Sequence, residues 1–140
     1  MTDGRGIPIA IGGIQSGNHN DLYLVVKQFS QMINSLNRST IVVQNSILNA
    51  DKGFDSKNLR RACGRRKMEP NIKENIRNRK YPKRGRKRFF NEQIYKRRFV
   101  NERAFAWIDS FKTLLVRFDK LDENWMNWHY LACALISLKV

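Results

Sequence analysis

The 140-residue chain has few cysteines and no long hydrophobic run. Its two cysteines, Cys63 and Cys133, lie far apart and lack metal-ligand spacing, which excludes a disulfide framework and a zinc site. No segment approaches the roughly 20 apolar residues that a bilayer span needs. Residues 1–5 show no basic region leading into an apolar one, as a secretory signal would. The sequence therefore predicts a protein of the reducing cytoplasm, without a membrane segment.

Acidic residues are scarce beside basic ones. The chain has 12 Asp and Glu against 27 Lys and Arg, for a formal charge of +15. Such an imbalance predicts a polyanionic partner, and nucleic acid is the first expectation, ahead of an anionic membrane surface. With 41% hydrophobic residues, the chain is long enough for one domain with a modest core.

The positive charge is concentrated in the middle of the chain. Residues 60–98 contain seventeen Lys and Arg and only three Glu. Residues 75–90 have neither helical nor strand periodicity, and they include Pro82 and Gly85. We predict a mobile basic loop here that becomes ordered on an anion. A solvated basic face is the alternative, but the excess of cations is larger than solubility requires.

Apolar residues alternate between strand-like and helix-like patterns. Strands are predicted at short apolar runs, namely residues 7–11, 46–50 and 70–72, with 41–43 as a lead-in to the second. Helices are predicted at residues 22–36, 56–66 and 108–136. Asn20 or Asp21 is the expected cap of the first helix. This order predicts an α/β fold with some parallel strand pairing.

One short segment joins a strand to a helix through an acidic residue. Asp51 follows the apolar run 46–50, and Gly53, Asp55 and Ser56 come next. That order predicts a buried strand ending in a carboxylate, a glycine turn, and a helix capped by Asp55 or Ser56. We assign Asp55 to the cap rather than to a metal. Taken alone, Asp51 could simply cap a turn.

A second acidic residue lies on a predicted basic helix. Tyr95, Arg98 and Glu102 fall at positions i, i+3 and i+7, which places them on one helical face. Because arginines flank Glu102, a surface ion pair is the alternative. A carboxylate at a strand end and another on a basic helix are suited to holding magnesium against a phosphodiester. The sequence therefore predicts a shared metal site formed by Asp51 and Glu102.

Three motifs in this order resemble those of bacterial insertion-sequence transposases of the DDE class. They are Gly17-Asn18-His19-Asn20-Asp21, the segment Leu48–Ser56, and the Tyr95-x-x-Arg98-x-x-x-Glu102 signature. The resemblance covers nearly the whole chain. It implies a ribonuclease-H-like fold whose three acids hold two magnesium ions for cleavage and transfer of DNA strands. By this match Asp51 is the second acid and Glu102 the third.

The chain also departs from the family pattern at two places. The family's opening strand, with its first acid, precedes a segment like Asp3–Pro8, where this chain begins; Asp3 itself matches a turn. The lysine that often follows the signature glutamate is replaced by Asp109. We therefore expect residues 1–140 to form part of a DDE catalytic domain, incomplete at the N-terminus and with C-terminal helices. We also expect this chain alone to be inactive.

The resemblance implies double-stranded DNA, and transposon ends in particular, as partners. It also implies a bacterial, nucleoid-associated location and self-association or pairing with intact transposase. Tyr95 and Arg98 would support the site or touch the DNA backbone. Further DNA contacts are predicted at Arg77, Arg79, Lys80, Lys83, Arg84, Arg86, Lys87 and Arg88. The alternative is a non-catalytic DNA-binding or regulatory remnant of a transposase; a general basic nucleic-acid-binding protein would leave the placed acids unexplained.

Overall fold

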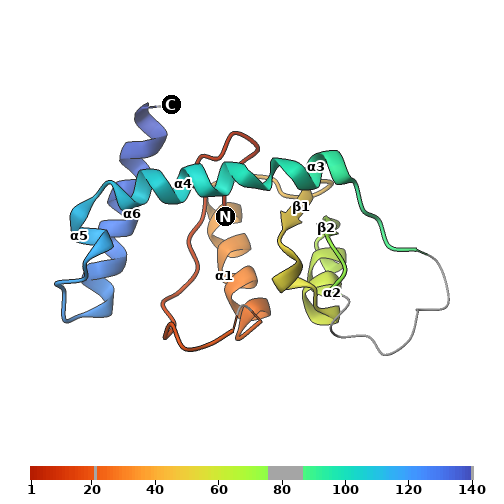
Figure 1. Cartoon of the computed structure of the whole chain (residues 1–140), viewed down its shortest axis with the longest axis horizontal. Coiled ribbons are helices and arrows are strands. Elements are labelled where there is room, and N and C mark those ends of the chain that lie inside the picture. Colours follow the sequence, from red (N-terminus) through yellow and green to blue (C-terminus); the bar gives the residue numbers. More distant parts are fainter. Residues whose placement is uncertain (21, 76–86, 140) are drawn as a thin grey trace. The chain divides into compact units, whose positions relative to one another are not determined.

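The computed structural model describes residues 1–20, 22–75 and 87–139 (Figure 1). The chain divides into two compact units. One unit is Gly17–Arg98. The other combines Met1–Ser16 with Phe99–Val140. Most of the predicted basic loop lies outside the described residues, and so do six predicted DNA-contact residues: Arg77, Arg79, Lys80, Lys83, Arg84 and Arg86.

A strand–helix–strand motif forms the centre of the unit that comprises residues 17–98. β1 (Ile47–Ala50) pairs in parallel with β2 (Glu69–Ile72), and α2 (Lys57–Arg65) connects them. Parallel neighbours need a crossover of this kind, because a tight turn would reverse the chain direction. The structure confirms the two predicted strands and the basic helix between them. It also confirms that the strands pair in parallel.

The core of this unit lies between the two longer helices and the sheet. α1 (Val25–Arg38) packs against α2, and α2 packs against β2. Three residues spaced along one face of α1 are buried, as the amphipathic stripe predicted. The buried apolar residues of the unit are Phe29, Ile33, Leu36, Leu59, Ala62, Cys63, Met68, Ile72 and Tyr95.

Two details before β1 differ from the predictions. α1 begins at Val25, behind Leu24, whose φ of 51° breaks the helical path, and Asn20 instead accepts the Leu22 N–H at 3.0 Å. The predicted cap at Asn20 is therefore wrong, and residue 21 lies outside the described part. The predicted lead-in 41–43 reaches β1 through a turn, in which the Val43 carbonyl accepts the Ser46 hydroxyl at 2.5 Å.

Three helices make up most of the other unit. α4 (Val100–Asp109), α5 (Lys112–Leu115) and α6 (Asp122–Lys139) pack on one another. Their buried residues include Ala104, Leu114, Ala132, Cys133 and Ile136. The predicted helical C-terminal third is confirmed. Among the described residues no helix is both long and apolar enough to cross a bilayer.

The N-terminal segment of that unit forms a turn instead of the strand predicted at residues 7–11. Thr2 and Pro8 make a single antiparallel bridge, and proline has no N–H with which to extend a ladder. Asp3 caps the turn by accepting the N–H groups of Arg5 and Ile7, both at 2.9 Å. Asp3 therefore lies at a turn, while its match to the family's turn position stays a prediction. Gly6, at φ +87°, leaves no room for a Cβ beside α4.

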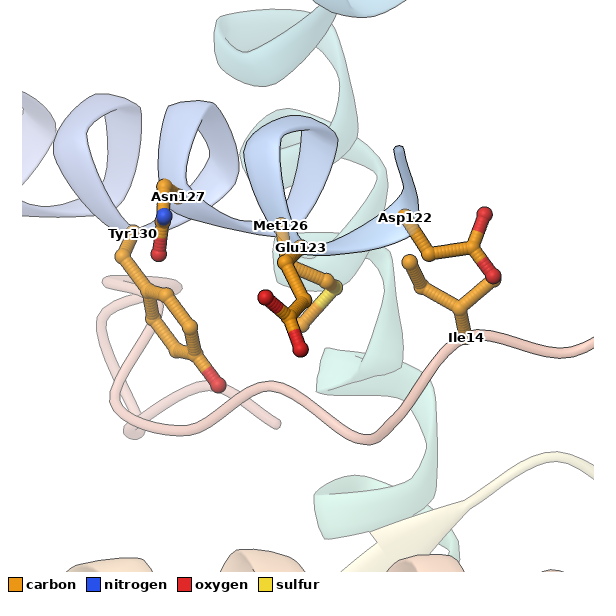
Figure 2. A pocket seen from close by; sticks show the side chains of 6 residues that line it. All are labelled: Ile14, Asp122, Glu123, Met126, Asn127 and Tyr130. Carbon is orange, nitrogen blue, oxygen red and sulfur yellow. The ribbon is translucent and has the colours of Figure 1, made fainter. Parts of the chain in front are cut away.

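An open groove of about 430 Å³ lies on the same unit, lined by Ile14, Asp122, Glu123, Met126, Asn127 and Tyr130. Figure 2 shows Glu123 and Tyr130 directed from α6 toward the chain segment that carries Ile14. The two carboxylates lie in the first turn of α6, where the helix dipole stabilises negative charge. They would repel a phosphate backbone, so we assign this groove no role in DNA contact.

Candidate functional site

The predicted residues Asp51, Tyr95 and Arg98 meet at the end of β1. Asp51 directly follows the strand and starts the short 3₁₀ helix η1 (Lys52–Phe54). Its Oδ1 accepts the Lys52 N–H at 2.7 Å and the Tyr95 hydroxyl at 2.8 Å. The Nε of Arg98 lies 3.9 Å from the same oxygen. The carboxylate is thus held by a backbone donor, a phenol and a nearby cation.

These contacts keep Asp51 ionised and Tyr95 protonated. The Tyr95 hydrogen bond is the main cause that lowers the pKa of Asp51, followed by the Lys52 N–H, with a smaller contribution from Arg98; partial burial opposes them. Burial raises the pKa of Tyr95, and the bond to Asp51 raises it further. Tyr95 therefore keeps the proton that it donates, and Asp51 keeps its negative charge.

Tyr95 and Arg98 also stabilise each other. α3 (Glu92–Lys96) carries Tyr95, which is 7% exposed. The Arg98 guanidinium lies 4.7 Å from the centre of the Tyr95 ring, within the range of a cation–π contact. The Phe90 ring packs at a tilt against Tyr95 with centroids 5.2 Å apart. Because Arg98 remains 44% exposed, it can reach an anion in solution beside Asp51.

The second oxygen of Asp51 is the open one. All three contacts involve Oδ1, and no described residue donates a hydrogen bond to Oδ2. The side chain is 56% exposed, and hard divalent cations favour carboxylate oxygens of this kind. The carboxylate of Asp51 is therefore suited to supply one of the ligands of a metal ion. Over residues 1–20, 22–75 and 87–139, no three His, Cys, Asp or Glu side chains form a ready cluster.

A network of three asparagines holds α3 against the sheet. Asn49 and Asn71 face each other in register on β1 and β2, and Asn71 Nδ2 donates to Asn49 Oδ1 at 3.2 Å. Asn71 also exchanges two bonds with the backbone of Asn91, at 2.7 and 3.0 Å. Asn49 Nδ2 donates to the Ile94 carbonyl at 2.8 Å. Because Ile94 precedes Tyr95, the network places the Tyr95 hydroxyl beside Asp51.

Sequence reasoning missed this network, although a signal was present. Asn49 and Asn71 lie within two runs predicted as strands, and an amide that a sheet buries needs hydrogen-bond partners. Asn71 is in fact fully buried. The partner Asn91 lies twenty residues after Asn71, beyond residues 76–86, which we call the basic segment. Only the fold therefore identifies Asn91 as a partner.

Asp55 has a different role from the predicted helix cap. Ser56 caps α2, since its hydroxyl oxygen accepts the Leu59 N–H at 3.1 Å. The Asp55 side chain is 7% exposed and forms ion pairs with Arg60 and Arg88 instead. Both residue types suit a cap, but a buried carboxylate in so basic a chain is more stable beside guanidinium groups.

Glu102 belongs to the other unit, in the first turn of α4, where it is exposed. The single helix predicted across the signature is divided, because the 3₁₀ turn η3 (Arg97–Phe99) separates α3 from α4. A 3₁₀ turn has about 3.0 residues per turn rather than 3.6, so the spacing of one regular helix does not hold across the signature, and the shared face of Tyr95, Arg98 and Glu102 stays a prediction. The meeting of Glu102 with Asp51 stays a prediction.

The last two predicted DNA contacts lie before α3. Lys87 is exposed, whereas Arg88 is half-buried. Arg88 contacts Asp55 at 3.1 Å and Glu74 at 3.5 Å. Lys87 is therefore the better placed of the two to meet a DNA backbone. Arg88 already has carboxylate partners.

Replacing Tyr95 with Phe should raise the pKa of Asp51. The substitution removes the largest contribution to the lowered value and keeps the ring beneath Arg98. Carboxyl ¹³C NMR titration of Asp51 measures the change. Tyr130→Phe, which removes an exposed hydroxyl in the other unit, should leave the titration as it is. An unchanged Asp51 titration in Tyr95→Phe would show that the hydroxyl does not stabilise the charge.

Comparisons with known proteins agree with these motifs. The family described as "Transposase DDE domain" matches residues 1–137. The chain is 28% identical, over 141 residues, to a Burkholderia cepacia protein described as a putative transposase for insertion sequence element IS402. The alignment covers 97% of this chain and 59% of that protein, so the chain spans about three fifths of the relative's length. No solved structure matches. Since the family match includes almost every residue, the chain belongs to the DDE-domain transposases of insertion sequences.

Proposed function

We propose that this chain binds transposon DNA and supplies two carboxylates, Asp51 and Glu102, to the metal site of an insertion-sequence transposase. Transposases of this family use divalent metal ions, and we propose Mg²⁺. The observation that carries the proposal is the ionised carboxylate of Asp51 at the end of β1, with one oxygen held and the other open. In the complete enzyme, the metals would activate the attacking oxygen and stabilise the leaving oxygen.

The residues around Asp51 have separable tasks in this proposal. The Lys52 N–H and the Tyr95 hydroxyl fix Oδ1 and so orient Oδ2 toward a ligand. Arg98 is a half-exposed cation within 4 Å of the carboxylate, which suits it to hold a phosphate group next to the metal. Glu102 also has a role within its own unit. Its negative charge lies in the first turn of α4, where it stabilises the helix through the helix dipole.

The excess of cations supports DNA as the partner. Seventeen Lys and Arg in residues 60–98 match the electrostatic requirement of a phosphate backbone. We propose contacts from Arg98 and Lys87, and from the cations of residues 76–86, whereas Tyr95 is buried and acts through its bond to Asp51. The proposal also includes transposon ends as the DNA that is bound and a second transposase chain as a protein partner. It further places the chain in the bacterial nucleoid.

The parallel β1–α2–β2 motif supports a ribonuclease-H-like fold for this chain. That fold is an α/β architecture, and a mixed structure with a small parallel sheet is what the described residues contain. Functional groups commonly lie at the carboxyl ends of parallel strands. Asp51 occupies such a strand end.

Removing cations from the basic segment should flatten the salt dependence of DNA binding. A variant with Lys80, Lys83, Arg84 and Arg86 changed to Ala should lose roughly one unit of log–log salt slope per lost phosphate contact. Fluorescence anisotropy with duplex DNA over a salt series measures this slope. The matched control replaces the exposed cations Lys27, Arg38, Lys112 and Lys120, which removes the same charge. Equal slopes in both variants would contradict specific contacts from the segment.

A non-catalytic DNA-binding role is the second candidate, favoured by Asp109 at the position where the signature often has a lysine. With Mg²⁺ and supercoiled plasmid, we expect binding without nicking by these 140 residues alone. Two carboxylates here match family acids, whereas two-metal chemistry in the family uses three. Gel electrophoresis of the plasmid measures nicking. Nicking that is lost in both Asp51→Asn and Glu102→Gln would overturn this expectation and make the chain a working nuclease.

A further inference from the structure

Asp55 is a buried carboxylate that accepts hydrogen bonds from three separate parts of one unit. Its Oδ1 accepts Arg60 Nε at 2.9 Å and an Arg88 guanidinium N–H at 3.1 Å. Its Oδ2 accepts the backbone N–H of Asn75 at 2.9 Å. The side chain is 7% exposed and that of Arg60 is 11% exposed. A carboxylate so enclosed is stable only because each oxygen has a partner.

Arg60 connects this carboxylate to the sheet. Besides Asp55, its guanidinium donates to the Ile72 carbonyl at 2.8 Å and to the Pro70 carbonyl at 3.4 Å. Those carbonyls belong to β2, and Arg60 itself lies on α2. Asp55 is therefore attached to a rigid part of the unit, four residues after Asp51.

The two remaining partners are the ends of the basic segment. Asn75 precedes residues 76–86 and Arg88 follows them. Arg88 also contacts Glu74 with Nε at 3.5 Å from Oε1. One carboxylate thus joins the two points where the chain enters and leaves a stretch with six Lys and Arg and no acid.

We infer that Asp55 is a positioning residue that fixes both ends of the basic segment, through Asn75 and Arg88, next to the strand end that carries Asp51. The inference rests on the proposed DNA-binding function. Holding the ends before DNA arrives lowers the entropy that must be lost on binding. It also keeps both ends of the segment in contact with a residue that lies four positions after Asp51.

Removing the charge of Asp55 separates this role from plain electrostatics. Asp55→Asn makes the protein more positive, so electrostatic attraction alone predicts tighter DNA binding. We predict instead that Asp55→Asn binds DNA roughly three- to tenfold more weakly than the wild type. The two ends of the basic segment are no longer held in this variant and must be ordered when DNA binds. Asp109→Asn is the matched control: it makes the same charge change at an exposed position on α4 and should bind DNA as tightly as the wild type or more tightly. Tighter binding in both variants would overturn the inference.

Limited trypsin digestion tests the same role without DNA. We predict faster cleavage after the cations of residues 76–86 in Asp55→Asn than in the wild type or in Asp109→Asn. Equal cleavage in all three proteins would overturn the inference. If the wild type shows no salt-dependent DNA binding, the proposed function fails, while the digestion still decides whether Asp55 fixes the segment.

A second pair of variants applies if Asp55→Asn does not fold, which circular dichroism shows. Arg88→Gln releases only one end of the segment and leaves the bonds of Asp55 to Arg60 and Asn75. Lys27→Gln removes the same charge from an exposed position on α1 of the same unit. We predict that Arg88→Gln weakens DNA binding roughly threefold more than Lys27→Gln and that only Arg88→Gln speeds digestion. Equal effects of the two variants would contradict the role of Asp55.

Discussion

The arrangement of the site depends on keeping one buried amide fully hydrogen-bonded. Asn71 has no exposed surface, so leaving its side chain unpaired would be costly. Its bonds reach Asn49 across the parallel strands and Asn91 at the start of α3. The sheet and this helix therefore share one network. Tyr95 on α3 owes its place beside Asp51 to that network.

Two aspartates four residues apart show how their surroundings separate their tasks. Asp51 is half-exposed with an open oxygen and partners on one side only. Asp55 is enclosed, and although burial raises its pKa, the Asn75 N–H and the two guanidinium groups hold that pKa below its ordinary value. The first suits a ligand for an added cation. The second has its charge neutralised within the fold and suits a structural anchor.

The local pattern of the chain predicted the strand–helix–strand motif well, because apolar runs and a serine cap act over a few residues. The family motifs predicted that Tyr95 and Arg98 support the site or touch the DNA backbone, and only the structure shows that both contact Asp51. The anchor at Asp55 was missed, since its partners lie up to 33 positions away. The strand predicted at residues 7–11 does not form for a comparable reason. A strand needs a neighbouring strand to pair with, and among the described residues this segment makes only the single bridge between Thr2 and Pro8.

Iron-directed cleavage tests most directly whether Asp51 and Glu102 share a metal site. Fe²⁺ in place of Mg²⁺, with ascorbate and peroxide, produces radicals that cut the backbone close to a bound ion. If the two residues share a site, we expect cuts near both residue 51 and residue 102. Excess Mg²⁺ should suppress these cuts, and they should be lost in Asp51→Asn and in Glu102→Gln but not in Asp109→Asn. Cuts near only one of the two residues, or cuts that persist in either variant, would contradict the shared site.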